Sequence, residues 1–176
     1  MAHFMTNTAI SGVAPPEAAE VTIMTVSPSI AEFKLGQMIG RGCRAGGGGA
    51  FSVGNLVALA SIPAALGLFF WSLRPWAVKR YRLTNRRIVI QKGTRQAEDA
   101  GVALDQFDRV EINVQPGQEW YPAGDLVLYH GPVECLRLLG VPHPESFRHT
   151  LLKAHVAFTG VQEALEAHEK ELTAAG

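Results

Sequence analysis

Residues 51–73 read FSVGNLVALASIPAALGLFFWSL, and the next stretch, from Arg74 to Arg95, carries eight basic side chains and no acidic one. The apolar run is 23 residues long. As a helix it would measure about 34 Å, enough for a hydrocarbon core of about 30 Å. Soluble core helices seldom run so far without a charge. The sequence therefore predicts a transmembrane helix, to which we assign residues 45–76 with their Gly-rich lead-in.

The composition of this run suits a membrane helix. Gly54, Pro63 and Gly67 are small or helix-bending residues, which membrane helices tolerate because neighbouring helices approach closely. Trp71 and Trp76 lie where an interfacial aromatic belt is expected. The basic residues follow the run, so the positive-inside rule predicts a single-pass protein whose C-terminal part is cytoplasmic.

The topology of the N-terminal side stays open. We expect residues 1–29 to be a flexible segment, since they are rich in Ala, Thr, Ser and Pro. Residues 30–44 carry a partial apolar face and are expected to form an amphipathic or interfacial segment. With one span, residues 1–44 lie outside. The alternative is that residues 30–44 form the first arm of a hairpin, with Gly46–Gly49 as its turn, which returns the N-terminus to the cytoplasm.

Charge is strongly segregated along the chain. Residues 98–176 carry five basic and thirteen acidic residues, a net charge of −8, although the whole chain sums to zero. The basic block fits contact with anionic lipid headgroups. The acidic remainder argues against nucleic-acid binding, which needs a distributed positive surface. Cys43 and Cys135 are too isolated to indicate a disulfide framework or a zinc site.

Beyond Val78 the pattern changes to short alternating runs typical of half-buried strands. The pattern predicts strands at 80–83, 87–91, 102–104, 107–114, 125–130 and 133–139. A helix follows from Pro142, with Phe147, Leu151, Ala154 and Phe158 on one stripe, and a last helix is expected at 161–172, after Gly160. These elements predict an α+β fold, in which a bent antiparallel sheet or small barrel is covered by a C-terminal helix.

Three motifs resemble those of the membrane-anchored bacterial pleckstrin-homology (PH-like) domain family. Tyr81–Ile90 (YRLTNRRIVI) is similar to the family's opening strand after a membrane segment, and Val102–Val110 (VALDQFDRV) to a later strand. Leu139–Glu145 (LGVPHPE) is similar to the entry into the final helix. The resemblance implies a small bent antiparallel β-barrel capped by a C-terminal helix, in a bacterial protein of the inner membrane. It implies no enzymatic activity and no cofactor. We assign the PH-like domain to residues 77–158 and a C-terminal helix or tail to residues 159–176.

The sequence contains only weak catalytic and metal-binding patterns. Asp105, Asp108 and Glu111 are spaced by three but lie in a predicted turn and strand, where such positions point in opposite directions. His143, His149 and His155 repeat every six residues, which separates them by about 120° on a helix and prevents a shared metal. Neither Ser61 nor Ser146 has a base nearby in the sequence. The sequence predicts a non-enzyme without a metal site or a small-molecule substrate.

Two functions remain as hypotheses. The first is an interaction module that docks onto another membrane protein, as an adaptor or accessory subunit. The second is a lipid-responsive module that reads headgroups through its basic first hairpin. The candidate lipid-facing residues share a positive charge and are Arg74, Lys79, Arg80, Arg82, Arg86, Arg87, Lys92 and Arg95. The candidate interface anchors are Trp71, Trp76, Trp120 and Tyr121, of which the last two serve alternatively as a plug in the core.

Overall fold

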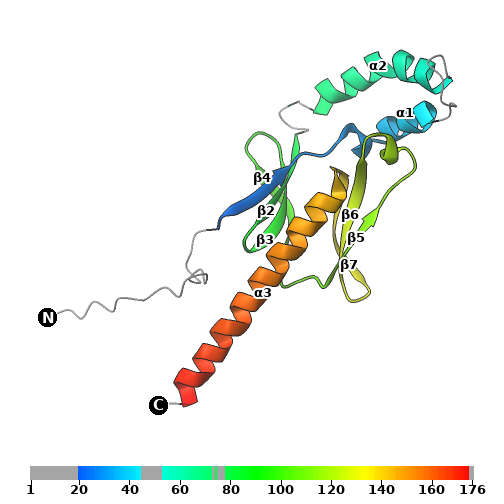
Figure 1. Cartoon of the computed structure of the whole chain (residues 1–176). Helices are drawn as coiled ribbons and strands as arrows, with labels where there is room; N and C mark the ends of the chain where they lie inside the picture. Colours follow the sequence, from blue (N-terminus) through cyan, green and yellow to red (C-terminus); the bar gives the residue numbers. More distant parts are fainter. Residues whose placement is uncertain (1–19, 45–52, 73, 75–77, 175–176) are drawn as a thin grey trace.

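The computed structural model describes residues 20–44, 53–72, 74 and 78–174, and these form an α+β fold with two antiparallel sheets and a long C-terminal helix (Figure 1). The predictions for residues 1–19, for the Gly46–Gly49 turn and for Trp76 fall outside the described residues. The elements in chain order are β1 (Thr22–Val26), η1 (Ile30–Glu32), α1 (Lys34–Arg44), α2 (Val53–Ser72), β2 (Lys79–Thr84), β3 (Arg87–Lys92), β4 (Ala97–Ala103), β5 (Arg109–Asn113), η2 (Gln118–Trp120), β6 (Ala123–His130), β7 (Val133–Pro142) and α3 (Pro144–Ala174).

The predicted first hairpin is confirmed. β2 and β3 pair antiparallel, with Tyr81 opposite Ile90 and Leu83 opposite Ile88. The hydroxyl of Thr84 closes the turn, since it accepts the backbone N–H of Arg87 at 3.0 Å and donates to the carbonyl oxygen of the same residue at 2.9 Å. A side chain that bonds to nearby backbone in this way stabilises a tight turn.

The core lies between the two sheets and the first half of α3. Alternate residues of β2, β3, β5, β6 and β7 face inward, as period-2 strands require. On α3, Phe147, Leu151 and Ala154 supply the predicted apolar stripe, and the first two are fully buried. Burying each such large side chain stabilises the fold by about 1.5–3 kcal/mol. The core thus fixes the first turns of α3 against both sheets.

The expected closed barrel is wrong. The strands form a four-stranded sheet in the order β1-β2-β3-β4 and a separate three-stranded sheet in the order β5-β6-β7. Between β4 and β5, the side chains of Leu104 and Phe107 enter the core. The chain therefore passes from one sheet to the other at this point instead of continuing the hydrogen-bonded ladder.

A strand forms inside the segment that the sequence analysis treats as flexible. β1 pairs antiparallel with β2, with Val26 opposite Tyr81 and Thr22 opposite Thr84. Farther along, the backbone N–H of Ser29 donates to the carbonyl oxygen of Gly140 at 2.8 Å. Residues 20–33 are therefore held against the domain by β1 and by the hydrogen bond of Ser29.

The segment 30–44 is helical, as η1 and α1, and its small residues are the buried ones. Its buried side on α1 consists of Gly36, Gly40 and Cys43, whereas Leu35 and Met38 are exposed. Small residues four and three apart let a helix approach another backbone closely. The large apolar side chains of α1 are therefore left on the outer side.

α2 is the helix that the apolar run predicts. It has 20 residues with Pro63 inside, and its window Gly54–Trp71 is long and apolar enough to cross a membrane. Only 6% of that window is buried. The helix lies beside α1 at one end of the molecule (Figure 1).

Several boundaries differ from the sequence-based expectation, and those of β4 and α3 differ most. β4 begins at Ala97 instead of 102, because its first residues are an exposed edge with little apolar patterning. α3 runs unbroken through Gly160, where the analysis expects two helices. A Cβ added at Gly160 would meet no atom within 4 Å, so no neighbouring segment requires a glycine here. The glycine lowers the stability of the helix by about 1 kcal/mol relative to alanine but does not end it.

Candidate functional site

α1 is held against the domain by contacts between glycines. A Cβ added at Gly40 would overlap the carbonyl oxygen of Gly117, and one added at Gly117 would overlap that of Gln37. Gly117 also has a φ of 98°, which L side chains rarely adopt. Arg41 Nε donates to the carbonyl oxygen of Pro116 at 2.9 Å. The backbone of α1 thus touches the loop before η2 directly.

A buried polar network fixes the same region from inside. Gln118 is fully buried, and its Nε2 donates to Asp125 Oδ1 at 2.7 Å and to the carbonyl oxygen of Ala31 at 3.4 Å. The same carboxylate oxygen accepts the backbone N–H of Gly140 at 2.9 Å. Buried polar groups that are satisfied in this way specify one arrangement of the surrounding chain. The network joins the N-terminal segment, η2, β6 and β7.

Tyr81 lies beside this network. Its hydroxyl donates to the carbonyl oxygen of Leu139 at 2.8 Å and accepts the N–H of the same residue at 3.1 Å. Burial, followed by the nearby charge of Glu32, raises the pKa of the Tyr81 hydroxyl well above its ordinary value of 10.0. Glu32 in turn pairs with Lys79 at the start of β2. Both groups are therefore parts of the structural frame.

A hollow of about 500 Å³ opens where α2 meets the domain. Phe69 of α2 contributes an apolar wall, and Lys79 and Arg80 at the start of β2 contribute cations. The rest of the lining comes from the N-terminal segment: Ser27, Pro28, Ser29, Ile30, Glu32 and Phe33, with Val78 beside them. The hollow thus combines an apolar wall with the Lys79–Glu32 ion pair and a second cation, Arg80.

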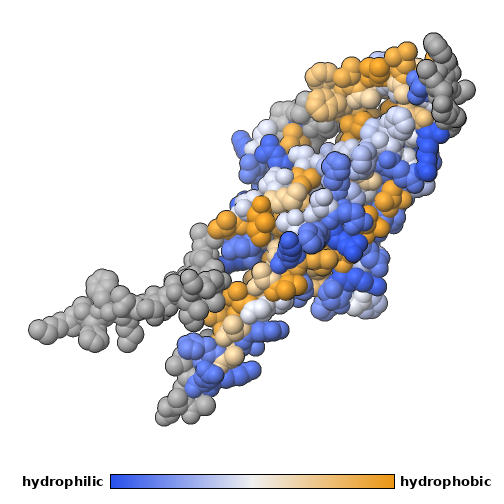
Figure 2. Space-filling model, in the orientation of Figure 1, coloured by the Kyte–Doolittle hydropathy of each residue, from blue (hydrophilic) through white to orange (hydrophobic). Residues whose placement is uncertain are grey.

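The outer surface of α2 is an apolar patch. Figure 2 shows a continuous hydrophobic surface over α2, at the end of the molecule that α1 also occupies. Its large exposed side chains are Leu56, Leu59, Ile62, Leu66, Phe69, Phe70 and Trp71. Contiguous apolar surfaces of this kind mark contact with a membrane or another protein.

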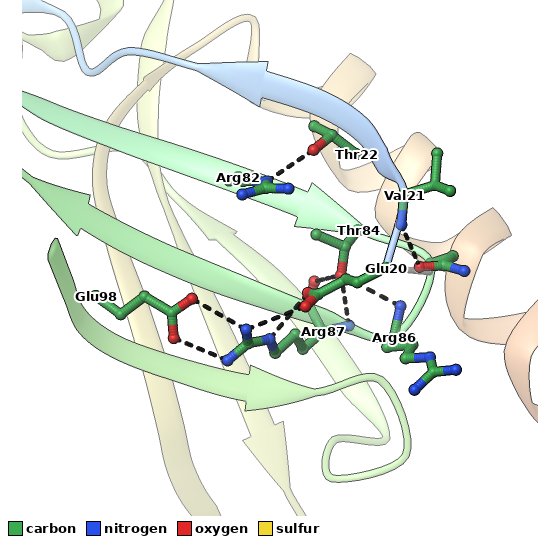
Figure 3. Close-up of polar contacts among 9 residues, drawn as sticks. Glu20, Val21, Thr22, Arg82, Thr84, Arg86, Arg87 and Glu98 are labelled. Atoms are coloured by element: carbon green, nitrogen blue, oxygen red, sulfur yellow. Dashed lines mark hydrogen bonds and ion pairs between the residues drawn. The ribbon is translucent and has the colours of Figure 1, made fainter. Parts of the chain in front are cut away.

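The far end of the β2–β3 hairpin is a network of ion pairs (Figure 3). Arg87 donates to both carboxylate oxygens of Glu20, at 2.9 and 3.1 Å, and to both of Glu98, at 2.8 and 3.0 Å. The hydrogen bond to Arg87 holds the pKa of the Glu20 carboxyl below its ordinary value of 4.5. The guanidinium therefore ties β1, β3 and β4 together, and two carboxylates offset its charge.

Several other residues of the predicted basic set are also engaged within the chain. Arg82 Nε donates to Thr22 Oγ1 at 2.7 Å, and Lys92 pairs with Asp99 at 2.6 Å. Arg74 lies over the ring of Trp71, 4.2 Å from its centroid. Arg86 and Arg95 are exposed at the two turns that flank β3. The set is thus spread over both ends of the hairpin: Arg74, Lys79, Arg80, Lys92 and Arg95 lie toward the end that faces α2, and Arg86 and Arg87 lie at the other turn.

The predicted aromatic anchors differ in their surroundings. Trp71 is 51% exposed at the end of α2, and Trp120 is 48% exposed on η2, so Trp120 does not plug the core. Tyr121 is half-buried against Gly40, and its buried hydroxyl oxygen has no hydrogen-bond partner among the described residues. Burial raises the pKa of that hydroxyl, with a smaller effect from Cys43. Tyr121 therefore lies in the surface of the domain against which α1 packs. We call the side of α1 that packs there, which includes Gly36, Gly40 and Cys43, the docking face of α1.

One residue of the acidic pattern and one of the histidine pattern make structural contacts. Asp108 Oδ2 accepts the N–H of Gly131 at 2.7 Å, and the His155 ring packs 4.9 Å from the Phe107 ring. His155 Nδ1 lies 2.5 Å from the carbonyl oxygen of Leu104. In the part of the chain that the structure describes, no three His, Cys, Asp or Glu side chains form a group that could hold a metal ion.

The sequence analysis missed the docking face of α1. Gly36 and Gly40 are spaced by four residues, a signal of close helix packing that could have indicated it. The buried network carries no comparable signal, because a buried glutamine such as Gln118 has no distinctive sequence context.

The comparisons with known proteins agree with this architecture. The model of the family described as "Bacterial PH domain" matches residues 29–155, which is well over half of the chain. Neither the curated proteins nor the solved structures contain a match. The matched range includes η1, α1 and α2 as well as the strands and the first part of α3. This chain belongs to the bacterial PH domain family.

Proposed function

We propose that this protein is a non-enzymatic interaction module, attached to the inner membrane through α2 and exposed to the cytoplasm, whose PH-like domain docks onto a partner membrane protein. In this role it is an adaptor or accessory subunit of a larger complex. The family match supports an interaction module in general. The basic residues around Arg74 and the exposed apolar surface of α2 support attachment to the membrane.

The observation that carries partner docking is the free end of α3. Figure 1 shows the C-terminal half of this helix extending past both sheets, at the end of the molecule opposite α2. The apolar stripe that packs Leu151 and Ala154 into the core continues through Phe158, Val161 and Leu165. These positions alternate by three and four residues, which is the spacing at which one helix packs against another.

The charge of this free end indicates the chemistry of its partner. Between residues 160 and 174 the helix carries Glu163, Glu166, Glu169 and Glu171 against Lys170. An apolar stripe flanked by acidic residues matches a partner helix that has its own apolar stripe and basic flanks.

The experiment is to extract the full chain from its native membranes in mild detergent and to determine the mass and composition of the complex. We expect one stoichiometric membrane protein to accompany the chain. Recovery of the chain alone would contradict the proposal.

A pair of variants tests the docking surface. Leu165→Asp places a charge on the stripe, and Ala167→Asp places the same charge about 200° around the helix. Both residues lie beyond the part of α3 that packs in the core, so both variants should fold. We expect the first to lose the partner and the second to retain it. Equal retention by both variants would exclude this face of α3.

The second candidate is a lipid-responsive module, and the hollow beside Phe69 favours it. Arg80 lies there next to an apolar wall and beside Lys79, whose charge is offset by one carboxylate, Glu32, whereas Arg87 at the far turn is offset by two carboxylates. We therefore expect any headgroup contact at the α2 end of the hairpin. Vesicles of equal charge density but different anionic headgroups would test it with the full chain. Equal binding to all of them would exclude headgroup specificity.

A further inference from the structure

We infer that α2 does not cross the membrane but lies within one leaflet, with α1 between it and the domain, so that both ends of α2 face the cytoplasm. This inference rests on the membrane attachment proposed above and specifies its geometry.

The C-terminal end of α2 is held close to the domain. Phe69 shares the hollow with Ile30 and Phe33 of the N-terminal segment and with Val78 at the start of the domain. Those segments are fixed in turn, because β1 pairs with β2 and Ser29 is hydrogen-bonded to Gly140. The end of α2 near Phe69 therefore lies on the domain side.

The N-terminal end of α2 is held on the same side through α1. A Cβ added at Gly42 of α1 would lie 2.8 Å from Val57 Cγ1, so the two helices touch near the start of α2. α1 itself is fixed along its length: Gly40 contacts Gly117, Arg41 donates to Pro116, and Arg44 pairs with Glu119. Both ends of α2 are thus connected to the same face of the domain.

Chain length argues against a crossing that leaves these contacts intact. If α2 crossed, its start would lie about 30 Å from its end, on the far side of the bilayer. The eight residues 45–52 would then have to return to α1 across the hydrocarbon. Fully extended, the nine steps from residue 44 to residue 53 span about 30–32 Å, which leaves no slack for such a return. An extended chain in lipid also leaves its backbone polar groups unpaired, and this cost argues most strongly against the crossing.

α1 and α2 together have the two-sided character that an in-plane anchor needs. α2 alone is apolar all round, which by itself favours a crossing helix. α1 covers one side of it with a polar, basic helix that carries Lys34, Arg41 and Arg44 and no acidic residue. Leu35 and Met38 are exposed on α1 and add to the apolar surface. A basic side next to an apolar side is typical of elements that lie in the plane of an anionic membrane.

The test is to determine from which side of the membrane a cysteine at residue 44 reacts with a maleimide. Arg44 is exposed, and its ion pair with Glu119 lies at the surface, so Arg44→Cys should cost little stability. Native Cys135 is exposed on the domain and reports the domain side in the same molecule, while Cys43 is buried. A membrane-impermeant maleimide is applied to intact spheroplasts and to inside-out vesicles. Glu163→Cys, on the free end of α3, is the matched control.

We expect no label on spheroplasts and two labelled cysteines per chain in inside-out vesicles, for both variants. Labelling of residue 44 on spheroplasts, or only after detergent is added, would overturn the inference, because residue 44 would then lie across or inside the bilayer. The proposed function fails separately: a chain that does not sediment with membranes would refute membrane attachment whatever the labelling pattern.

Discussion

Gly40→Ala tests how closely α1 is held against the loop at Gly117. The added methyl group would overlap the Gly117 carbonyl oxygen, which is backbone and cannot rotate away as a side-chain end can. Overpacking of a fitted contact costs about 1–3 kcal/mol. Alanine also favours the helix by about 1 kcal/mol relative to glycine. That gain is the same whether α1 is packed against the domain or has moved away from it, so it does not change the equilibrium between these two states.

Cys43 provides the assay, because it is 5% exposed on the docked face of α1 whereas Cys135 is exposed. In purified full chain, a thiol reagent should react quickly with Cys135 and reach Cys43 only through local opening. The cost given above predicts that Gly40→Ala accelerates labelling of Cys43 between about 5-fold and about 150-fold. The rate at Cys135 should not change.

Gly67→Ala is the control, since a Cβ at Gly67 would meet no atom within 4 Å. It should leave both labelling rates as they are. An unchanged rate at Cys43 in Gly40→Ala would refute the close approach of α1 to the domain, and with it the geometry inferred for α2.

Three further predictions concern stability and pH. Tyr81→Phe should destabilise the fold by about 1–3 kcal/mol, since it leaves the partly buried N–H of Leu139 without its acceptor. Because burial raises the pKa of Tyr81, its contribution to stability is fully present below pH 10 and is lost as the pH rises further. In thermal unfolding the variant should lose less stability above pH 10 than the wild type, and the remaining loss comes from groups such as Tyr121, whose pKa burial also raises. Asp125→Ala should cost about 3 kcal/mol in chemical denaturation, since it orphans buried donors, and a change below about 0.5 kcal/mol would contradict the network. Because the pKa of Glu20 is lowered, its contribution to the free energy of unfolding is present above its ordinary pKa of 4.5 and is lost as the pH falls below that value. Arg87→Gln should reduce this loss of stability at acid pH by at most about 1 kcal/mol in chemical denaturation, because the pair is partly exposed.

The elements that the sequence predicts well are those whose signal is local. The β2–β3 hairpin follows from alternation on both sides of Thr84, and the first half of α3 follows from the stripe that includes Phe147 and Leu151. In both cases the residues that make the pattern are the ones that the fold buries.

The elements that the sequence misses depend on partners far along the chain. β1 is a five-residue run whose strand character comes from β2, more than fifty residues away, and nothing local distinguishes it from an extended segment. The docking of α1 depends on Gly36 and Gly40, which carry no weight in an analysis of large apolar side chains. Gln118 and Asp125 are buried because they satisfy each other, a relation that composition does not reveal.

The candidate site was predicted in part. The sequence indicates the apolar helix and the basic residues that follow it. It does not show that Arg87 bridges Glu20 and Glu98, because ion pairing across strands depends on register. That pairing moves the expected lipid contact from the hairpin turn toward Lys79 and Arg80.

The central claim is that the exposed surface of α2 attaches the domain to a membrane, and sedimentation with membranes after an alkaline carbonate wash tests it most directly. Leu59→Ser, Ile62→Ser and Leu66→Ser together remove apolar side chains that are 66%, 48% and 50% exposed and lie outside the core. We expect the wild-type chain to stay in the membrane pellet. The triple variant should appear in the supernatant, folded, with Cys43 still protected. A wild-type chain in the supernatant, or a triple variant that stays in the pellet, would contradict the claim.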